Sequence, residues 1–160
     1  MTAPPPRRTA SWLARYRSLK VPFWKRVGMR VEDASPGEAA VRVPYDAGLR
    51  NANGVVHGGV VFAAADSAIA IALLGLIENR APIATIELKI NFLRPVDGED
   101  LLARARIIHC GRRTAVGEAT VFDGSGRAVA RALATYAIAS APSRRPPPAP
   151  RASAPGKTRR

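Results

Sequence analysis

The chain has 160 residues, a formal net charge of +13 and a single cysteine. Its length favours one domain, large enough to bury a core. One cysteine excludes an internal disulfide and a cysteine-rich metal site, and it favours a reducing compartment such as the cytoplasm. We expect Cys110 to be a small core residue after a strand. No apolar run opens the chain, so we expect no secretory signal.

Most of the excess positive charge lies at the two ends of the chain. Without the basic residues of 1–10 and 141–160, residues 11–140 carry +5, and neither end contains an acid. These ends also hold most of the prolines, so we predict a disordered lead at 1–10 and a disordered basic tail at 141–160. No zinc spacing, RNA-binding signature or interleaved aromatic pattern accompanies the charge, which argues against specific nucleic-acid recognition. Weak attraction of the tails to polyanions remains open.

After the lead, the pattern predicts a short amphipathic helix and then two strands. Trp12, Tyr16 and Leu19 recur at helical spacing in residues 11–20, with basic residues between them. We expect Pro22 to end this helix or to follow it closely, because proline cannot continue a helical ladder. Residues 27–31 and 38–44 predict two strands, separated by the turn signal Ser-Pro-Gly at 35–37.

The central segment predicts a long helix that is apolar on all sides. From Gly59 to Ile77 the only polar residues are Asp66 and Ser67. Such a helix is either buried or in a membrane. A membrane span would place Asp66 near the bilayer centre at a cost of about 2.5–3.5 kcal/mol, so we favour a buried helix without a membrane span. An unpaired buried carboxylate is also costly, which makes Asp66 the candidate for function.

Four further strands are predicted at residues 85–93, 101–109, 114–122 and 129–138, separated by glycine-containing turns. In the first of them we expect Ile86, Leu88, Ile90 and Phe92 to share one face. One apolar helix can cover a single face of a curved antiparallel sheet. The sequence therefore predicts an α+β domain over 11–140, in which the sheet wraps one central helix.

The loop before the long helix has the residues of an anion-binding helix start. Asn51, Asn53, Gly58 and Gly59 surround the start of the helix, where the first N–H groups lack intrahelical partners. Such groups can hold an anion or a developing oxyanion, although a plain loop-to-helix turn uses the same residues. Asp66 lies eight residues after Gly58, or roughly 12 Å along the axis. If both act on one substrate, the site must combine two copies of the chain in a two-fold dimer.

Other roles for the polar residues of this segment stay open. Asp66 alone could be an acid bonded to a neighbouring loop or helix end. His57 could be a base, because histidine titrates near neutrality, or it could hold the loop or position a substrate; we favour the latter roles. The nine-residue gap between His57 and Asp66 argues against shared metal coordination, so we expect no metal.

The polar residues form a spaced pattern, Asn51-x5-His57-Gly-Gly59-x6-Asp66, followed by Thr85-x-Glu87 and Asn91-Phe-Leu-Arg-Pro95. This pattern resembles the hotdog-fold acyl-CoA thioesterases of the phenylacetate-pathway (PaaI-type) group, over about residues 20–140. The resemblance implies a hotdog fold and a homodimer, usually paired into a homotetramer. It also implies hydrolysis of acyl-CoA thioesters without metal or cofactor.

By position, the resemblance implies that Asp66 is the nucleophile or the general base that activates water. It implies that the Gly58 N–H polarises the thioester carbonyl, while His57 and Asn51 orient the substrate and the loop. Asn53 and Gly59 would join the substrate site. The resemblance also implies a hydroxyl near the attacking water, which we place at Thr85. The register is uncertain by one residue, and a shift by one would put Ala84 at this position instead.

Arg112 and Arg113 are candidates to pair with the phosphates of CoA, although a pair of arginines in a turn is often just solvated. Two other functions remain as alternatives. One is a hotdog-fold acyl-thioester hydratase or dehydratase, which would usually pair Asp and His more closely. The other is a non-catalytic acyl-CoA or polyanion binder. The acyl group itself is left open between aromatic and medium-chain.

Overall fold

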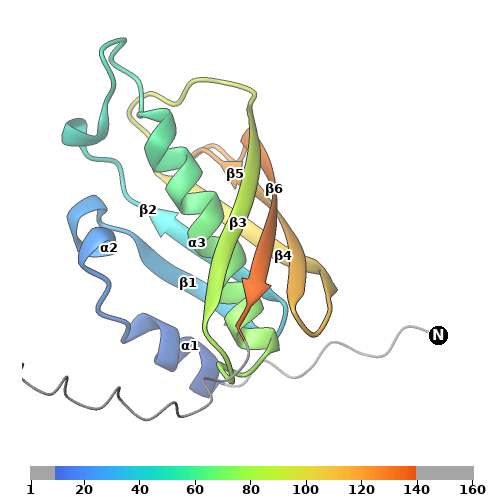
Figure 1. Ribbon diagram of the computed structural model, residues 1–160. Coiled ribbons are helices and arrows are strands. Elements are labelled where there is room, and N and C mark those ends of the chain that lie inside the picture. Colours follow the sequence, from blue (N-terminus) through green and yellow to red (C-terminus); the bar gives the residue numbers. More distant parts are fainter. Residues whose placement is uncertain (1–9, 140–160) are drawn as a thin grey trace, which may run out of the picture.

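Six antiparallel strands form one curved sheet around a long helix in this computed structural model, which describes residues 10–139 (Figure 1). The strand order is β1-β2-β4-β5-β6-β3, so β1 and β3 are the edges. The elements are α1 (Ala10–Arg17), α2 (Pro22–Val27), β1 (Arg30–Ser35), β2 (Glu38–Val43), the 3-10 turn η1 (Ala47–Leu49), α3 (Gly58–Leu76), β3 (Ile83–Phe92), β4 (Leu101–Cys110), β5 (Thr114–Phe122) and β6 (Ala128–Ile138). This is the hotdog arrangement, as predicted.

The long helix α3 is the centre of the core. Its buried residues surround most of its circumference, and they are Val60, Val61, Ala64, Ala65, Ser67, Ala68, Ile69, Ile71, Ala72, Leu73 and Gly75. Glycine allows the sheet to approach closely, because a Cβ on Gly117 of β5 would lie 2.5 Å from Cγ2 of Ile69. By length and hydropathy α3 could span a membrane, but here it is the buried core helix of the domain.

The N-terminal region contains a second helix that was not predicted, although Pro22 follows the end of α1 at Arg17 closely, as expected. This proline begins a second helix, α2, where its missing N–H costs nothing and its fixed φ suits the first helical position. The helix closes at Gly28, whose φ of 69° is the left-handed conformation that favours glycine. Residues 27–29 therefore belong to a helix end, and strand β1 begins only at Arg30.

Two side-chain hydrogen bonds attach this N-terminal region to α3. Trp24 donates its indole N–H to Ser67 Oγ at 3.1 Å. Asn79, just beyond the end of α3, donates to the Tyr16 hydroxyl at 2.7 Å, and Tyr16 is buried. Both buried polar groups thus have partners, as burial requires.

Edge strand β3 is more exposed than its alternating pattern predicted. Its register against β6 shifts between Thr85 and Glu87, which marks an irregularity in the pleat. Leu88 and Ile90 are half-buried, whereas Ile86 is 58 % exposed and Phe92 is 54 % exposed. The expected single buried face is therefore only partly realised within one chain.

The prediction for Cys110 was wrong. It is the last residue of β4 and its side chain is exposed rather than in the core. The strand runs past the region that α3 covers, because its last residues, from Ile108 onward, are all exposed. The predicted disordered ends, 1–10 and 141–160, lie outside the described residues except for Ala10.

Candidate active site

Asp66 lies on α3, facing β3 and β6, and one of its carboxylate oxygens accepts two hydroxyl donors. Thr85 Oγ1 of β3 donates to Oδ1 at 3.0 Å. The Tyr136 hydroxyl of β6 lies 2.6 Å from the same oxygen. Thr85 and Tyr136 are paired across the two strands, which brings both hydroxyls to one point. Thr85, rather than Ala84, therefore provides the hydroxyl beside the acid.

Tyr136 was not identified from the sequence. On β6 the residues at 130, 132, 134 and 136 are all buried, so Tyr136 continues an inward-facing row of alanines. A tyrosine in such a row has to find a hydrogen-bond partner for its hydroxyl. Burial raises the pKa of Tyr136 strongly, and the Asp66 carboxylate raises it further. The hydroxyl therefore stays protonated and donates.

The other oxygen of the Asp66 carboxylate is free to react. Within residues 10–139, Oδ2 has no hydrogen-bond partner, and the Asp66 side chain is half-buried. A carboxylate held at one oxygen and free at the other can accept a proton from water or attack an electrophile.

The loop before α3 is organised by Asn51. Its side-chain Oδ1 accepts from the backbone N–H of Asn53 at 2.9 Å, which is an Asx turn. Its backbone N–H donates to Val55 O at 2.8 Å, and its backbone oxygen accepts from Gly54 at 3.0 Å. The Nδ2 group of Asn51 and the exposed side chain of Asn53 have no partner within the described residues.

His57 caps the start of α3. Its Nδ1 accepts from the Gly59 N–H at 2.9 Å, so a neutral His57 carries its proton on Nε2 and can donate from there. The Gly59 N–H is thus engaged in the cap. The Gly58 N–H, in contrast, has no acceptor in the described part of the chain. Of the two glycines, Gly58 offers the free donor.

A cavity of about 310 Å³ lies beside Gly58. Its walls come from the loop, the start of α3 and the end of β3, and they include Asn51, Phe92 and Pro95. Asp66 is not among the lining residues. One chain therefore holds two separate halves, the loop with its free N–H and the acid with its two hydroxyls.

Arg112 and Arg113 form the exposed turn between β4 and β5. The backbone oxygen of Arg113 accepts from Ile138 at the end of β6, two residues beyond Tyr136. The turn therefore lies at the end of the sheet nearer to Tyr136 and Thr85 than to the loop. Neither guanidinium has a partner within residues 10–139. In that same part of the chain, no three His, Cys, Asp or Glu side chains are grouped as metal ligands would be.

Comparison with known proteins identifies the family. The model of the thioesterase superfamily matches residues 53–130, which include His57, all of α3 with Asp66, and Thr85. A Saccharolobus solfataricus protein named as an esterase is 32 % identical over 112 residues, which cover 70 % of this chain and 74 % of that protein. The chain belongs to the thioesterase superfamily.

Solved structures of this superfamily share the fold. The phenylacetic acid degradation protein PaaI of Thermus thermophilus, in a mutant form, is 32 % identical with a TM-score of 0.68, covering 73 % of this chain and 98 % of that one. PaaI of Escherichia coli is 26 % identical with a TM-score of 0.71, covering 79 % and 89 %. The Escherichia coli medium/long-chain acyl-CoA thioesterase YigI is 27 % identical over 100 residues, which are 54 % of this chain and 64 % of YigI. These relatives support a hydrolase of the thioesterase type.

Proposed function

We propose that this thioesterase-superfamily protein hydrolyses the thioester of an aromatic or medium-chain acyl-CoA to the free acid and CoA. The observation that carries the proposal is the Asp66 carboxylate, anchored at Oδ1 by Thr85 and Tyr136 and free at Oδ2. The similarity to YigI, named as an acyl-CoA thioesterase, and to PaaI proteins supports the substrate class.

In the proposed reaction, Asp66 Oδ2 takes a proton from water as the water oxygen bonds to the thioester carbonyl carbon, or Oδ2 itself forms that bond. Negative charge then develops on the carbonyl oxygen. The free N–H of Gly58, at the positive end of the α3 dipole, is the donor we assign to this oxyanion. Collapse of the intermediate breaks the C–S bond and releases the CoA thiolate, which takes up the proton held by Asp66 or one from solvent. Where Oδ2 has formed the bond, this collapse leaves an acyl–Asp66 anhydride, and water then hydrolyses it to the free acid and restores the carboxylate.

The two groups belong to different subunits in this proposal. Eight residues of helix separate Gly58 from Asp66 by roughly 12 Å, too far for both to touch one carbonyl. A homodimer in which two α3 helices run antiparallel brings the Gly58 of one chain to the Asp66 of the other. The resemblance to the PaaI group further implies that two dimers pair into a homotetramer.

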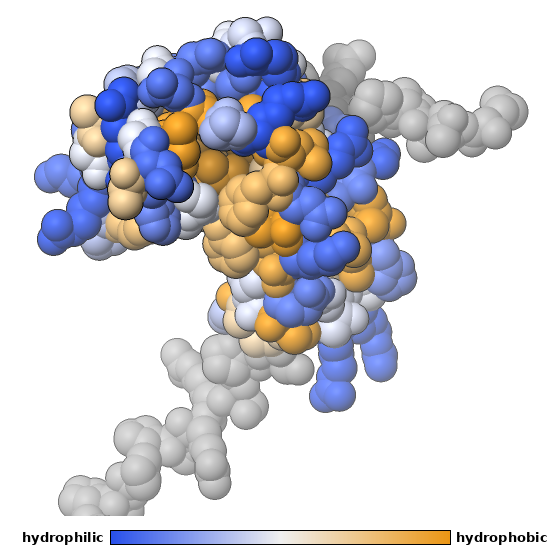
Figure 2. Space-filling model, turned by 90° about the horizontal axis from the view of Figure 1, so that it is seen from above, coloured by the Kyte–Doolittle hydropathy of each residue, from blue (hydrophilic) through white to orange (hydrophobic). Residues whose placement is uncertain are grey.

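Exposed surface at the edge of the sheet favours such a dimer. Strand β3 has a neighbour only on its β6 side, so one row of its backbone groups is unpaired in the single chain. The exposed apolar side chains Ile86 and Phe92 lie on the same strand, and Phe62 of α3 is 38 % exposed. Seen from above, apolar side chains gather within a largely hydrophilic surface (Figure 2). A patch of this kind is typical of an interface.

Binding roles follow from the free donors. We assign His57 Nε2 and Asn51 Nδ2 to the orientation of the substrate, with Asn53 and Gly59 in the loop that carries them. Arg112 and Arg113 are assigned to the CoA phosphates, because guanidinium groups pair well with phosphate and these two are exposed and unpaired in the described chain. No cofactor is required by this chemistry, and a cytoplasmic location stays a prediction.

The deciding experiment measures free thiol release from a panel of aromatic and medium-chain acyl-CoAs. Wild type should turn over at least one of them, and Asp66→Asn should fold, keep its oligomeric state and lose several orders of magnitude in kcat. Hydration of an enoyl-CoA without thiol release would favour the hydratase alternative. Binding of acyl-CoA without any turnover would favour the non-catalytic binder. Unchanged turnover by Asp66→Asn would remove the role of Asp66.

A further inference from the structure

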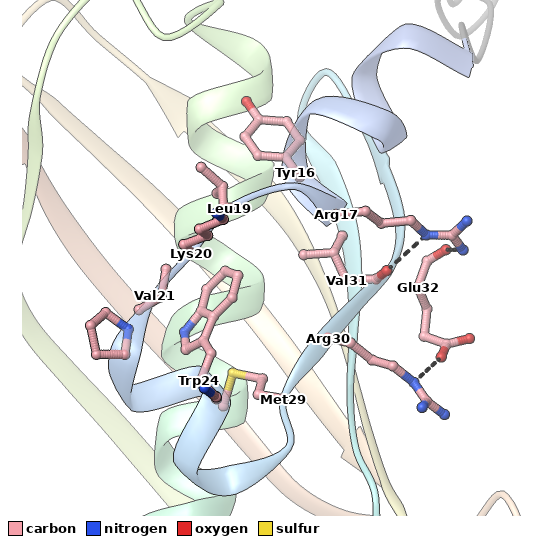
Figure 3. A pocket seen from close by; sticks show the side chains of 12 residues that line it. Tyr16, Arg17, Leu19, Lys20, Val21, Trp24, Met29, Arg30, Val31 and Glu32 are labelled. Carbon is pink, nitrogen blue, oxygen red and sulfur yellow. Dashed lines mark hydrogen bonds and ion pairs between the residues drawn. The ribbon is translucent and has the colours of Figure 1, made fainter.

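A second concave site lies between α1, α2 and β1, and neither Asp66 nor Gly58 lines it. Its volume is about 800 Å³, within the range of roughly 300–1,000 Å³ that is typical of small-molecule pockets. Apolar side chains form its floor and walls, as Figure 3 shows for Tyr16, Leu19, Val21, Trp24, Met29 and Val31. The groove is thus large enough for an apolar chain.

The floor of this groove is preformed. Tyr16, Met29 and Val31 are 2 %, 6 % and 3 % exposed, so they are packed against the core. The Trp24 ring is held in place by the hydrogen bond from its indole N–H to Ser67 Oγ of α3. A ligand would therefore meet an ordered apolar surface, which lowers the entropic cost of binding.

The rim of the groove is positively charged. Arg17, Lys20, Lys25 and Arg30 line it together with a single acid, Glu32, and Glu32 is already paired with Arg30 and with Arg42 outside the groove. Arg17 donates to backbone oxygens of Val31 and Glu32, which leaves its charge uncompensated (Figure 3). The side chains of Lys20 and Lys25 are exposed, and neither ammonium group has a hydrogen bond or ion pair to any described residue.

Charge decides which occupant fits. Residues 1–9 and 140–160 contain basic residues and no acid, so they are the wrong sign for this rim. A second copy of the groove has the same unfavourable charge. An apolar floor with two unpaired lysines at the mouth instead matches a molecule with an apolar chain and one anionic head.

We propose that this groove binds a fatty-acid anion, with its chain over Trp24 and Met29 and its carboxylate at Lys20 and Lys25. The binding geometry is independent of the reaction at Asp66. Only the source of the ligand rests on the proposed function, because thioester hydrolysis releases a carboxylic acid. Such a site would make the protein responsive to the class of product that it forms.

The test uses the full-length chain with Asp66→Asn and Trp12→Phe, so that no turnover occurs and Trp24 is the only tryptophan. Titration with dodecanoate should change the Trp24 fluorescence in a saturable way. Lys20→Glu with Lys25→Glu should weaken binding by about tenfold or more. The matched control, Arg104→Glu with Arg131→Glu, makes the same change in net charge at exposed cations outside the groove and should leave the affinity unaltered.

Several outcomes would overturn the site. One is binding of dodecyltrimethylammonium with the same affinity as dodecanoate. A second is an equal loss of affinity from the two charge-reversal pairs. A third is binding to phosphatidylglycerol vesicles but not to free dodecanoate. If the glutamate pair fails to fold by circular dichroism, Lys20→Gln with Lys25→Gln provides the same comparison with a smaller charge change. Because binding is measured without turnover, failure of the proposed thioesterase reaction would leave this result standing, and the reverse also holds.

Discussion

The Tyr136 hydroxyl lies 2.6 Å from Oδ1 of Asp66 and 2.8 Å from the backbone oxygen of the same residue. Tyr136 is 1 % exposed, and burial together with the nearby carboxylate raises its pKa, so it remains a donor at any working pH. With Thr85 donating to the same Oδ1, the carboxylate is held against rotation. This leaves Oδ2 as the carboxylate oxygen with no hydrogen-bond partner in the described chain, and it is the oxygen to which we assign the proposed reaction.

Removal of the Tyr136 hydroxyl should therefore lower the rate of thioester hydrolysis more than it weakens substrate binding. Tyr136→Phe keeps the ring and deletes only the hydroxyl, so we expect kcat to fall by about tenfold to a hundredfold while KM changes little. Steady-state thiol release measures both constants. Because Thr85→Val removes the second donor to the same oxygen, the two substitutions should be non-additive in a double-mutant cycle. An unchanged kcat in both single variants would contradict the positioning role.

The Gly58 N–H can be deleted without breaking α3, because Gly58 is the first helical residue and proline is accepted there. His57 already has the extended conformation that precedes proline. We expect Gly58→Pro to lower kcat by about a hundredfold to a thousandfold, the usual effect of losing one oxyanion donor. Gly58→Ala is the matched control: it adds the same Cβ, 3.3 Å from Phe92 Cζ, but keeps the N–H. Equal losses in both variants would assign the effect to crowding.

A site shared between subunits can be restored by mixing defective chains. When Asp66→Asn and Gly58→Pro chains are co-expressed, a mixed dimer contains one intact site and one site with both defects. Random pairing should then return about a quarter of wild-type activity, although each homodimer is inactive. Thiol release by the co-expressed mixture measures this, and doubly tagged, purified mixed dimers should show about half of the wild-type activity. No recovery, despite proven mixed dimers, would place both residues in one subunit.

The contribution of the His57 cap to the stability of the protein can be measured separately from activity. His57→Ala leaves the Gly59 N–H without its acceptor and should lower the free energy of unfolding by about 1 kcal/mol, as for other lost N-caps. His57→Asn keeps a side-chain acceptor at this position and should restore most of that stability. Urea unfolding of the three proteins gives the comparison. If His57→Asn is stable yet slow, the ring also orients the substrate.

Stability at low pH should depend on Asp123, in the turn after β5. Burial alone would raise the pKa of Asp123, but hydrogen bonds from Ser125 and Arg127 outweigh it and hold the pKa at about 2. The charged form is thus favoured in the folded state. Its stabilisation is complete above about pH 4, the usual aspartate pKa, and is lost as the pH falls toward 2.

Asp123→Asn should therefore be less stable than wild type at neutral pH, and the gap between them should narrow between about pH 4 and pH 2. Thermal unfolding at several pH values tests this. Asp97→Asn is a suitable control, because Asp97 is exposed and its one ion pair, with Arg50, is on the surface. A constant difference across the pH range would remove Asp123 from the acid response.

Local pattern was sufficient for most elements of this fold. The apolar run after Gly59 could only be a buried helix or a membrane span, and the Ser-Pro-Gly turn at 35–37 separates β1 from β2 as predicted. The hairpin between β5 and β6 follows from its glycine-rich turn. The second helix was missed because a proline that follows one helix can also begin the next, and in the structure α2 is attached to α3 by the hydrogen bond from Trp24 to Ser67.

Contacts between distant segments account for what the pattern did not predict. Tyr136 follows Asp66 by 70 residues, and no spacing rule connects a strand near the end of the domain to the middle of a helix. The exposure of Ile86 and Phe92 likewise depends on β3 being an edge strand, which the order of strands along the chain does not reveal. Cys110 is exposed because β4 extends beyond α3.

By itself, the sequence determined the α+β class, the central helix with its single acid, and the loop of Asn51, His57 and Gly58 that precedes it. Each of these features depends on residues that lie close together in the sequence, so the rise of a helix and the chemistry of the side chains were enough to predict it. Only the tertiary structure decided which hydroxyls hold Asp66, which glycine N–H is left free, and that an apolar groove with a basic rim lies beside α2. Each of these requires the curved sheet to bring together segments that are far apart in the chain.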